Sequence, residues 1–244
     1  MSNGSAPRVV LFDAGNTLVF VEPTRALEVL APFGASDDAE VFDAAERTAR
    51  LRLTELLSAP QPPPEAEAWR RYFGTLLGAL GIDARHLRTA GRALWEAHER
   101  DHMWTRTDPR TAPALERLRD EGYRLGVVSN ADGRMPGLIE KVGLAPYFEF
   151  VVDSHLVGVA KPDARIFREA LDRLAANGDA LRPEECIYVG DLYAVDVVGA
   201  RAAGLRPVLL EPFGQFIQCT PSAPAVGIDA HLGPAGAAQQ VVDR

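Results

Sequence analysis

Five short apolar runs place the strongest constraint on how this chain can fold. They lie at residues 8–12, 124–128, 148–152, 186–189 and 207–210, and apart from Glu149 and the arginines that open the first two, each is continuous rather than alternating. Continuous apolar runs are typical of parallel strands that are buried on both faces of a sheet. Helix-like segments separate the later runs, at residues 112–121, 134–142, 164–176 and 194–203. Strands that alternate with helices predict βαβ units, so we expect an α/β fold with a doubly wound parallel sheet.

The long stretch between the first two apolar runs has a different pattern. It contains helix-like segments and no convincing strand, with the helices expected at residues 24–30, 37–57, 65–80 and 83–101. We therefore expect two domains: residues 1–21 with 107–244 form the sheet domain, and residues 22–106 form an inserted helical domain. The proline-containing tail after residue 211 is expected to wrap the sheet edge before a last strand near residues 227–232.

Composition narrows the class of partner and the compartment. The net charge of -8 argues against a basic surface that binds nucleic acid or a membrane. No apolar run approaches the roughly 18 residues of a membrane span, and the first residues lack the apolar region of a secretory signal. The two cysteines, Cys186 and Cys219, are far apart, as is typical of buried thiols in a reducing compartment. We therefore expect a cytoplasmic protein; its oligomeric state cannot be predicted.

Polar side chains gather where the predicted strands end. Ligands of open α/β sheets bind beyond the carboxyl ends of the strands, so these side chains are candidates for a shared site. Lysine is rare here, with only Lys141 and Lys161 in the chain, and this makes the lysine of the set more notable. The set that follows the strands is Asp13, Ser129, Asn130, Lys161 and Asp191, with Asp196 behind Asp191.

These residue types suit phosphoryl transfer. Asp13 can attack phosphorus as a nucleophile and form an aspartyl-phosphate. The hydroxyls of Thr17 and Ser129 can donate hydrogen bonds to phosphoryl oxygens, and Lys161 supplies a compact positive charge. Asp13 and Asp191 offer the hard oxygen ligands that Mg²⁺ prefers. The set therefore predicts a magnesium-dependent site for phosphoryl transfer.

Four motifs, in order, resemble those of the haloacid dehalogenase-like hydrolase superfamily, in its capped, phosphatase-like branch. They read LFDAGNTL (11–18), VVSNA (127–131), KP (161–162) and GDLYAVD (190–196). Each motif alone is weakly specific, but the four in order, each after a predicted strand, are a strong signal. The resemblance implies a Rossmann-like core, with residues 22–106 in the place of the family's helical cap.

The resemblance also implies roles for individual residues. Asp13 would be the nucleophile and Lys161 the motif lysine, while Ser129 and Asn130 would bind phosphate. Metal binding would involve Asp13 and the backbone carbonyl of Gly15. Asp191 and Asp196 would serve Mg²⁺ directly or through its water ligands.

The chain departs from the family pattern at Gly15. Family phosphatases usually carry DxDGT, in which the second Asp donates a proton to the leaving oxygen and later activates water. This chain has D-A-G-N-T at residues 13–17, so the side chain of the general acid and base is missing. General acid–base catalysis contributes about 10²–10⁴-fold, so its loss would be serious but need not abolish turnover. Asn16 tolerates a left-handed turn, and we expect the loop geometry to hold.

Two alternatives to a phosphatase remain open. A catalytically weak or silent binding or regulatory protein would also lack the acid at position 15. A dehalogenase-like hydrolase lacks that acid too, but resembles a metal-free branch that usually carries Ser-Asn-type residues where this chain has Gly190-Asp191. A phosphonate hydrolase of the family needs a cap lysine, and residues 22–106 contain none.

Charged groups of the insert are predicted to be solvated. His86, His98 and His102 are expected to face water rather than to act in catalysis. The arginines of the segment 37–57 recur as on a solvated helix face, and they are Arg47, Arg50 and Arg52.

Overall fold

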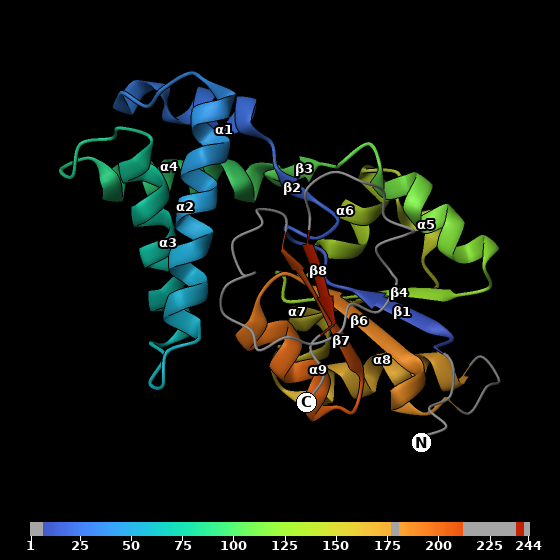
Figure 1. Cartoon of the computed structure of the whole chain (residues 1–244). Coiled ribbons are helices and arrows are strands. Elements are labelled where there is room, and N and C mark those ends of the chain that lie inside the picture. The colour runs from blue at the N-terminus through green and yellow to red at the C-terminus, as the bar shows by residue number, and fades with distance from the viewer. Residues whose placement is uncertain (1–6, 177–180, 212–237, 242–244) are drawn as a thin grey trace. The chain divides into compact units, whose positions relative to one another are not determined.

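The structure, a computed structural model, describes residues 7–176, 181–211 and 238–241. The chain divides into two compact units, shown together in Figure 1. We call Met1–Val19 with Thr107–Arg244 the sheet unit, and Phe20–Arg106 the helical unit. None of the helices that the structure describes is both long and apolar enough to cross a membrane.

A mostly parallel sheet forms the centre of the sheet unit. Its order is β5-β4-β1-β6-β7-β8, in which only β8 runs antiparallel to its neighbour. The predicted α/β, doubly wound fold is therefore confirmed. The tail strand expected near residues 227–232 lies outside the described residues. The strands are β1 (Val9–Phe12), β4 (Arg124–Ser129), β5 (Val151–Asp153), β6 (Cys186–Gly190), β7 (Arg206–Glu211) and β8 (Ala238–Val241).

Helices cover both faces of this sheet. The helices α5 (Thr111–Asp120) and α6 (Met135–Lys141) lie on one face, while α8 (Ala164–Ala176) and α9 (Val198–Ala202) lie on the other (Figure 1). The face under α8 holds a buried core of strand and helix side chains, including Leu11, Val128, Ile166, Phe167 and Tyr188. Because β1 lies between β4 and β6, the connections diverge at its carboxyl end, where such folds bind ligands.

Two predicted elements of the sheet unit differ from the structure. The strand expected at 148–152 is β5, which spans Val151–Asp153. It begins later than expected because a 3₁₀ turn at Ala145–Tyr147 precedes it. It is followed at once by an unpredicted short helix, α7 (Ser154–Val157). The helix expected at 194–203 begins as a wide π-helical turn, Tyr193–Val197, and becomes α9 only at Val198.

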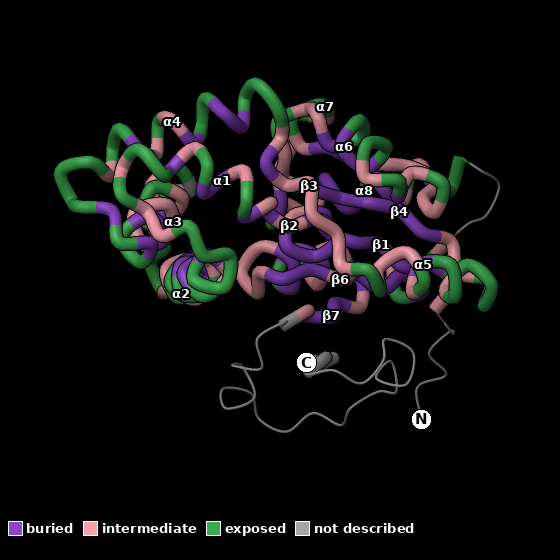
Figure 2. Tube along the Cα trace, turned by 90° about the horizontal axis from the view of Figure 1, so that it is seen from above, coloured by how far each residue is buried: buried purple, intermediate pink, exposed green. Residues whose placement is uncertain are grey.

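The helical unit contains the expected long helices. They are α1 (Pro23–Leu30), α2 (Ala39–Leu57), α3 (Glu65–Ala79) and α4 (Leu87–Arg100), and the Asp38 side chain caps the start of α2. Helix α2 packs along α3, with Phe42, Leu53, Tyr72 and Leu76 buried. Figure 2 shows buried segments along these helices.

Three expectations for the insert were wrong. A short antiparallel ribbon joins β2 (Phe20–Val21) to β3 (Trp104–Arg106), although no strand was predicted within 22–106. Arg50 and His98 are only 6% and 7% exposed, although both were predicted to be solvated. Arg50 lies beside Glu46 on the same helix, and the His98 Nδ1 atom accepts a hydrogen bond from the Met103 N–H. Buried partners of this kind are tertiary contacts, which a helical repeat does not encode.

Candidate active site

The turn after β1 places Asp13 and Thr17 at the carboxyl end of the sheet. Asp13 directly follows the strand, and the Ala14 carbonyl accepts hydrogen bonds from Leu18 and Val19. Asn16 has a left-handed backbone with φ of 57°, which confirms the loop geometry expected from the sequence. The Thr17 Oγ1 atom is buried without a hydrogen-bond partner among the described residues. Buried hydroxyls normally have a partner, so this atom is a candidate donor to a bound ligand.

Lys161 is held by three oxygen atoms at the centre of the site. Its Nζ donates to Asp13 Oδ1 at 2.6 Å, to Asp196 Oδ1 at 2.7 Å and to Tyr188 Oη at 2.9 Å. The residue is only 4% exposed, so these three acceptors replace water around the ammonium. The lysine therefore lies in a fixed position between two carboxylates.

Asn130 fixes the backbone of this lysine. Its Nδ2 donates to the Lys161 carbonyl at 3.0 Å, and its Oδ1 accepts from the Lys161 N–H at 2.7 Å. The side chain that was predicted to bind phosphate thus makes two hydrogen bonds to the protein itself. Ser129 ends β4 and is 2% exposed, so it lies at the same edge of the sheet.

Three buried carboxylates lie together at this edge. Oxygen atoms of Asp13, Asp191 and Asp196 lie within 4.8 Å of one another. Asp196 is held in place because its Oδ2 accepts from the Leu192 N–H at 2.8 Å. Gly190 is necessary for this packing, since a Cβ at that position would lie 2.6 Å from the Cβ of Asp196. The cluster offers only oxygen ligands, which suit a hard divalent cation.

Burial and charge act in opposite directions on the two central groups. Burial raises the pKa of the Asp13 carboxyl, although Lys161 works against this rise. Burial disfavours the charged form of Lys161, but Asp13 and Asp196 outweigh it and raise the pKa of the ammonium above its usual range. The lysine therefore stays protonated, and its charge favours the ionised form of Asp13 that a nucleophile needs.

Tyr188 belongs to the site and was not predicted from the sequence. Its hydroxyl accepts from Lys161 and donates to the Val128 carbonyl at 2.9 Å. Burial, followed by the charges of Asp196 and Asp13, raises the pKa of Tyr188 well above its usual value, so it remains a neutral hydroxyl. It lies within an apolar strand, and no feature of the sequence separates it from an ordinary core aromatic.

We expect Tyr188→Phe to lower the free energy of unfolding by about 1–3 kcal/mol, the usual cost of losing buried hydrogen bonds. Urea denaturation measures this difference. Tyr123→Phe is the matched control, because the half-buried Tyr123 hydroxyl makes no hydrogen bond with any described residue. Equal stability of the two variants would contradict a supporting role for the Tyr188 hydroxyl.

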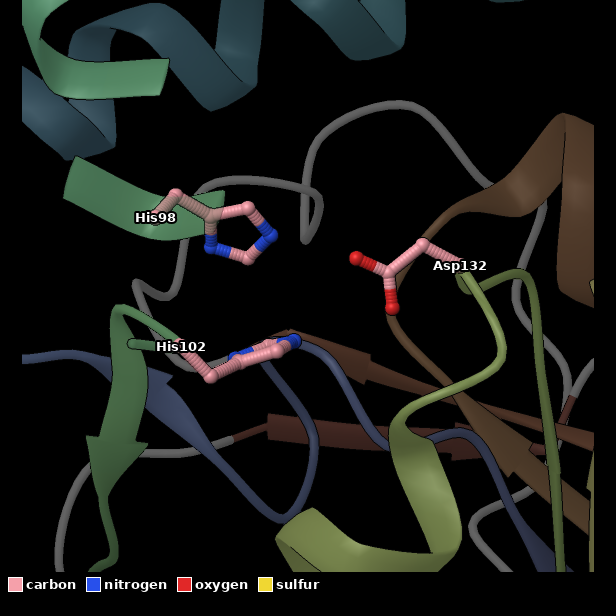
Figure 3. Close-up of side chains that lie close together, drawn as sticks. All are labelled: His98, His102 and Asp132. Carbon is pink, nitrogen blue, oxygen red and sulfur yellow. The ribbon is translucent and has the colours of Figure 1, made fainter. Parts of the chain in front are cut away.

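The histidines of the insert form a separate feature of the helical unit. The rings of His98 and His102 pack edge to face, with centroids 4.4 Å apart and planes inclined by 64° (Figure 3). His86 is exposed at the start of α4. Asp132, drawn in the same figure, belongs to the sheet unit and forms an ion pair with Arg134, consistent with an ordinary loop acid.

Comparisons with known proteins agree with the motif pattern. A family model described as haloacid dehalogenase-like hydrolase matches residues 7–204. The mouse "Haloacid dehalogenase-like hydrolase domain-containing protein 3" is 37% identical over 125 residues, which cover 50% of this chain and 48% of the mouse protein. The match thus spans about half the length of that relative.

Two further comparisons cover most of the chain. A protein named glyceraldehyde 3-phosphate phosphatase, from Methanothermobacter thermautotrophicus, is 29% identical over 204 residues, which cover 83% of this chain and 85% of that protein. The crystal structure of the HAD-hydrolase YfnB from Bacillus subtilis bound to magnesium matches with a TM-score of 0.60 and 20% identity. That match covers 90% of this chain and 91% of the other, and it shows likeness of fold.

Proposed function

Since this chain belongs to the haloacid dehalogenase-like hydrolases, we propose that it is a Mg²⁺-dependent phosphatase of small phosphorylated metabolites, acting through an aspartyl-phosphate. The observation that carries the proposal is the buried contact between Asp13 and Lys161, with Asp191 and Asp196 beside it. A nucleophile, a fixed positive charge and oxygen ligands for a metal are the groups that phosphoryl transfer requires.

In the first step, an oxygen of Asp13 attacks phosphorus, and the bond from phosphorus to the leaving oxygen breaks. Lys161 holds Asp13 in place and carries positive charge at the point where the phosphoryl group arrives. Thr17 Oγ1 and Ser129 Oγ donate hydrogen bonds to the phosphoryl oxygens in this proposal. The unpartnered Thr17 hydroxyl supports that assignment. Asn130 acts by positioning the backbone of Lys161.

In the second step, water attacks the aspartyl-phosphate, phosphate leaves and the Asp13 carboxylate is restored. The leaving oxygen of the first step gains a proton, and the water of the second step loses one. Gly15 has no side chain that could carry either proton. Both transfers therefore pass through solvent or the substrate, and we propose slow turnover of substrates whose leaving group is a strong base.

The residues present fit a magnesium ion. Asp13, Asp191 and the Gly15 carbonyl would hold it, with Asp196 acting directly or through water. The buried oxygen cluster supports this donor set, since Mg²⁺ takes oxygen ligands and usually keeps several waters. When bound, the ion neutralises negative charge on the phosphate and the surrounding carboxylates.

We expect Asp191→Ala to weaken Mg²⁺ binding by about 10-fold or more. Removing a residue that only supports a metal ligand already costs about 10–100-fold in metal affinity, and removing a ligand should cost at least as much. Calorimetric titration of MgCl₂ into the full chain measures this change. Asp120→Ala serves as the control, because Asp120 is exposed at the end of α5. Unchanged affinity in Asp191→Ala would remove that residue from the metal site.

The proposal extends to the helical unit and to the compartment. We propose that residues 22–106 act as a cap on a hydrolase core formed by residues 1–21 and 107–244. A small substrate is supported by the archaeal relative, whose name specifies a three-carbon phosphate. Cys186 is a buried free thiol, and burial raises its pKa to about 11, which suits an inert thiol in the cytoplasm.

A screen of phosphorylated metabolites, with Mg²⁺ and with EDTA, tests the proposed function. Release of inorganic phosphate should depend on Mg²⁺ and should be found for at least one small phosphate ester. Turnover that persists unchanged in EDTA would contradict the magnesium requirement.

The missing acid at Gly15 favours a second candidate, a binding or regulatory protein with little or no turnover. This candidate predicts that the chain binds Mg²⁺ and inorganic phosphate but releases no phosphate from any ester. It also predicts that Gly15→Asp remains inactive.

A further inference from the structure

The helical unit contains a pocket that shares no residue with the candidate active site. The cavity measures about 410 Å³ and lies between α3 and α4, two neighbouring helices in Figure 1, with β2 and β3 contributing to its wall. Small-molecule pockets in proteins have volumes of about 300–1,000 Å³, so this one is large enough for a ligand. Much of its wall is apolar and aromatic, and includes Phe73, Leu77, Leu94, Trp95, Met103 and Trp104.

Two helix-interior glycines belong to the wall of this pocket. Gly74 lies within α3 and Gly91 within α4. A glycine inside a helix costs about 1 kcal/mol relative to alanine. Close packing does not require either glycine: a Cβ at Gly74 would meet no atom within 4 Å, and one at Gly91 would lie at an ordinary 3.6 Å from Leu77. The absence of side chains at these positions therefore keeps the space open.

The charged side chains on the pocket are both cationic. Arg70 of α3 and Arg88 of α4 line it, and no carboxylate is found among the described lining residues. Several other arginines of the unit are paired with acids, as Arg71 is with Glu67 and Arg92 with Glu96. The side chains of Arg70 and Arg88 form no hydrogen bond or ion pair with any residue that the structure describes. In a chain of net charge -8, two exposed guanidinium groups at one apolar pocket favour an anion.

We propose that this pocket binds a small amphipathic anion, of the fatty-acid or aromatic-acid class. The apolar body of the ligand fills the space beside Gly74 and Gly91, and its carboxylate accepts hydrogen bonds from Arg70 and Arg88. This inference does not rest on the proposed phosphatase activity, because none of these residues takes part in it.

Decanoate is the probe, titrated into the full chain while tryptophan fluorescence is recorded. Trp95 and Trp104 line the pocket, so the emission should change and saturate at one decanoate per chain. Decanol, which has the same apolar body without the charge, should bind more weakly. Asp13→Asn should bind decanoate as the natural chain does, which separates this site from the proposed catalytic one.

Gly74→Leu should abolish the decanoate signal, because its side chain fills the pocket. The matched control is Gly78→Leu, one turn further along α3. An added Cβ at Gly78 also meets nothing within 4 Å, but Gly78 does not line the pocket. Circular dichroism checks that both variants are folded.

The double variant Arg70→Gln, Arg88→Gln should weaken decanoate binding by about 10–100-fold and leave decanol binding unchanged, since charge-assisted hydrogen bonds are lost. Arg100→Gln, at an exposed arginine of α4 outside the pocket, is its control. The double arginine variant keeps the proposal testable if Gly74→Leu does not fold.

Three results would overturn the proposal. The first is no saturable response to decanoate, and the second is equal binding by Gly74→Leu or by the double arginine variant. The third is a tryptophan signal that changes with protein concentration in the absence of decanoate and disappears in Gly74→Leu. That result would mean that a second copy of the chain covers the pocket.

Discussion

Asp13→Asn is expected to lower phosphate-ester turnover by about 10⁴–10⁶-fold, the range found when catalytic-triad residues of a hydrolase are removed. The amide keeps an Oδ1 acceptor for the Lys161 ammonium, so the site should keep its geometry. It loses the negative oxygen that attacks phosphorus, and no aspartyl-phosphate can form. Phosphate release under saturating Mg²⁺ measures the effect.

The control for this variant is Asp120→Asn, which makes the same chemical change on an exposed helix end. Urea denaturation should show that Asp13→Asn is folded. Turnover of Asp13→Asn at the level of the natural chain would mean that water attacks the substrate directly, or that the reaction takes place elsewhere.

The second large effect is expected at Gly15. Gly15→Asp should raise the turnover of alkyl phosphates by up to about 10²–10⁴-fold, the contribution of a well-placed general acid. Asn16 already holds the left-handed turn next to this position, so the loop can present a side chain in the manner of the family motif. Gly15→Asn is the matched control, because it has nearly the same shape and cannot donate an acidic proton.

The natural chain should show the complementary selectivity. Aryl and acyl phosphates have leaving groups that carry negative charge without a proton, so they should react far faster than alkyl phosphates. The aspartyl-phosphate should also persist, because no base at position 15 activates water, and intact-protein mass spectrometry should detect it. Steady-state rates on one aryl and one alkyl phosphate test the selectivity.

Efficient hydrolysis of an alkyl phosphate by the natural chain would disprove the idea that the acid is missing. Another group would then supply the proton, and His86, His98 and His102 would be the first to be substituted. If neither the natural chain nor Gly15→Asp turns over either substrate, while both bind Mg²⁺ and phosphate, the silent-binder candidate is favoured.

The sheet was predictable because its strands are buried on both faces. Such strands appear in the sequence as short apolar runs, too short for helices, and β1, β4, β6 and β7 lie within one residue of their predicted bounds. The strand β5 was misplaced because Phe148 belongs to the same apolar run but follows a 3₁₀ turn. The ribbon of β2 and β3 was missed because strands of two and three residues are too short for a periodic signal.

The candidate site was predictable as a set of residues but not as a set of contacts. Asp13, Lys161, Asp191 and Asp196 come together because parallel strands end at one edge of a sheet. The sequence did not indicate that Asn130 holds the lysine backbone, since an amide after a strand serves a ligand or the protein equally well.

The close approach of Asp196 to Gly190 has a consequence for comparing related sequences. A Cβ at position 190 would lie 2.6 Å from the Cβ of residue 196, so even Asp196→Ala leaves no room for a side chain at 190. In any chain with this local backbone, the requirement for glycine at position 190 is therefore steric and independent of the carboxylate at position 196. Loss of that carboxylate in a single mutation would leave the requirement in place, so residue 196, and not residue 190, separates a chain that has kept the acid from one that has lost it.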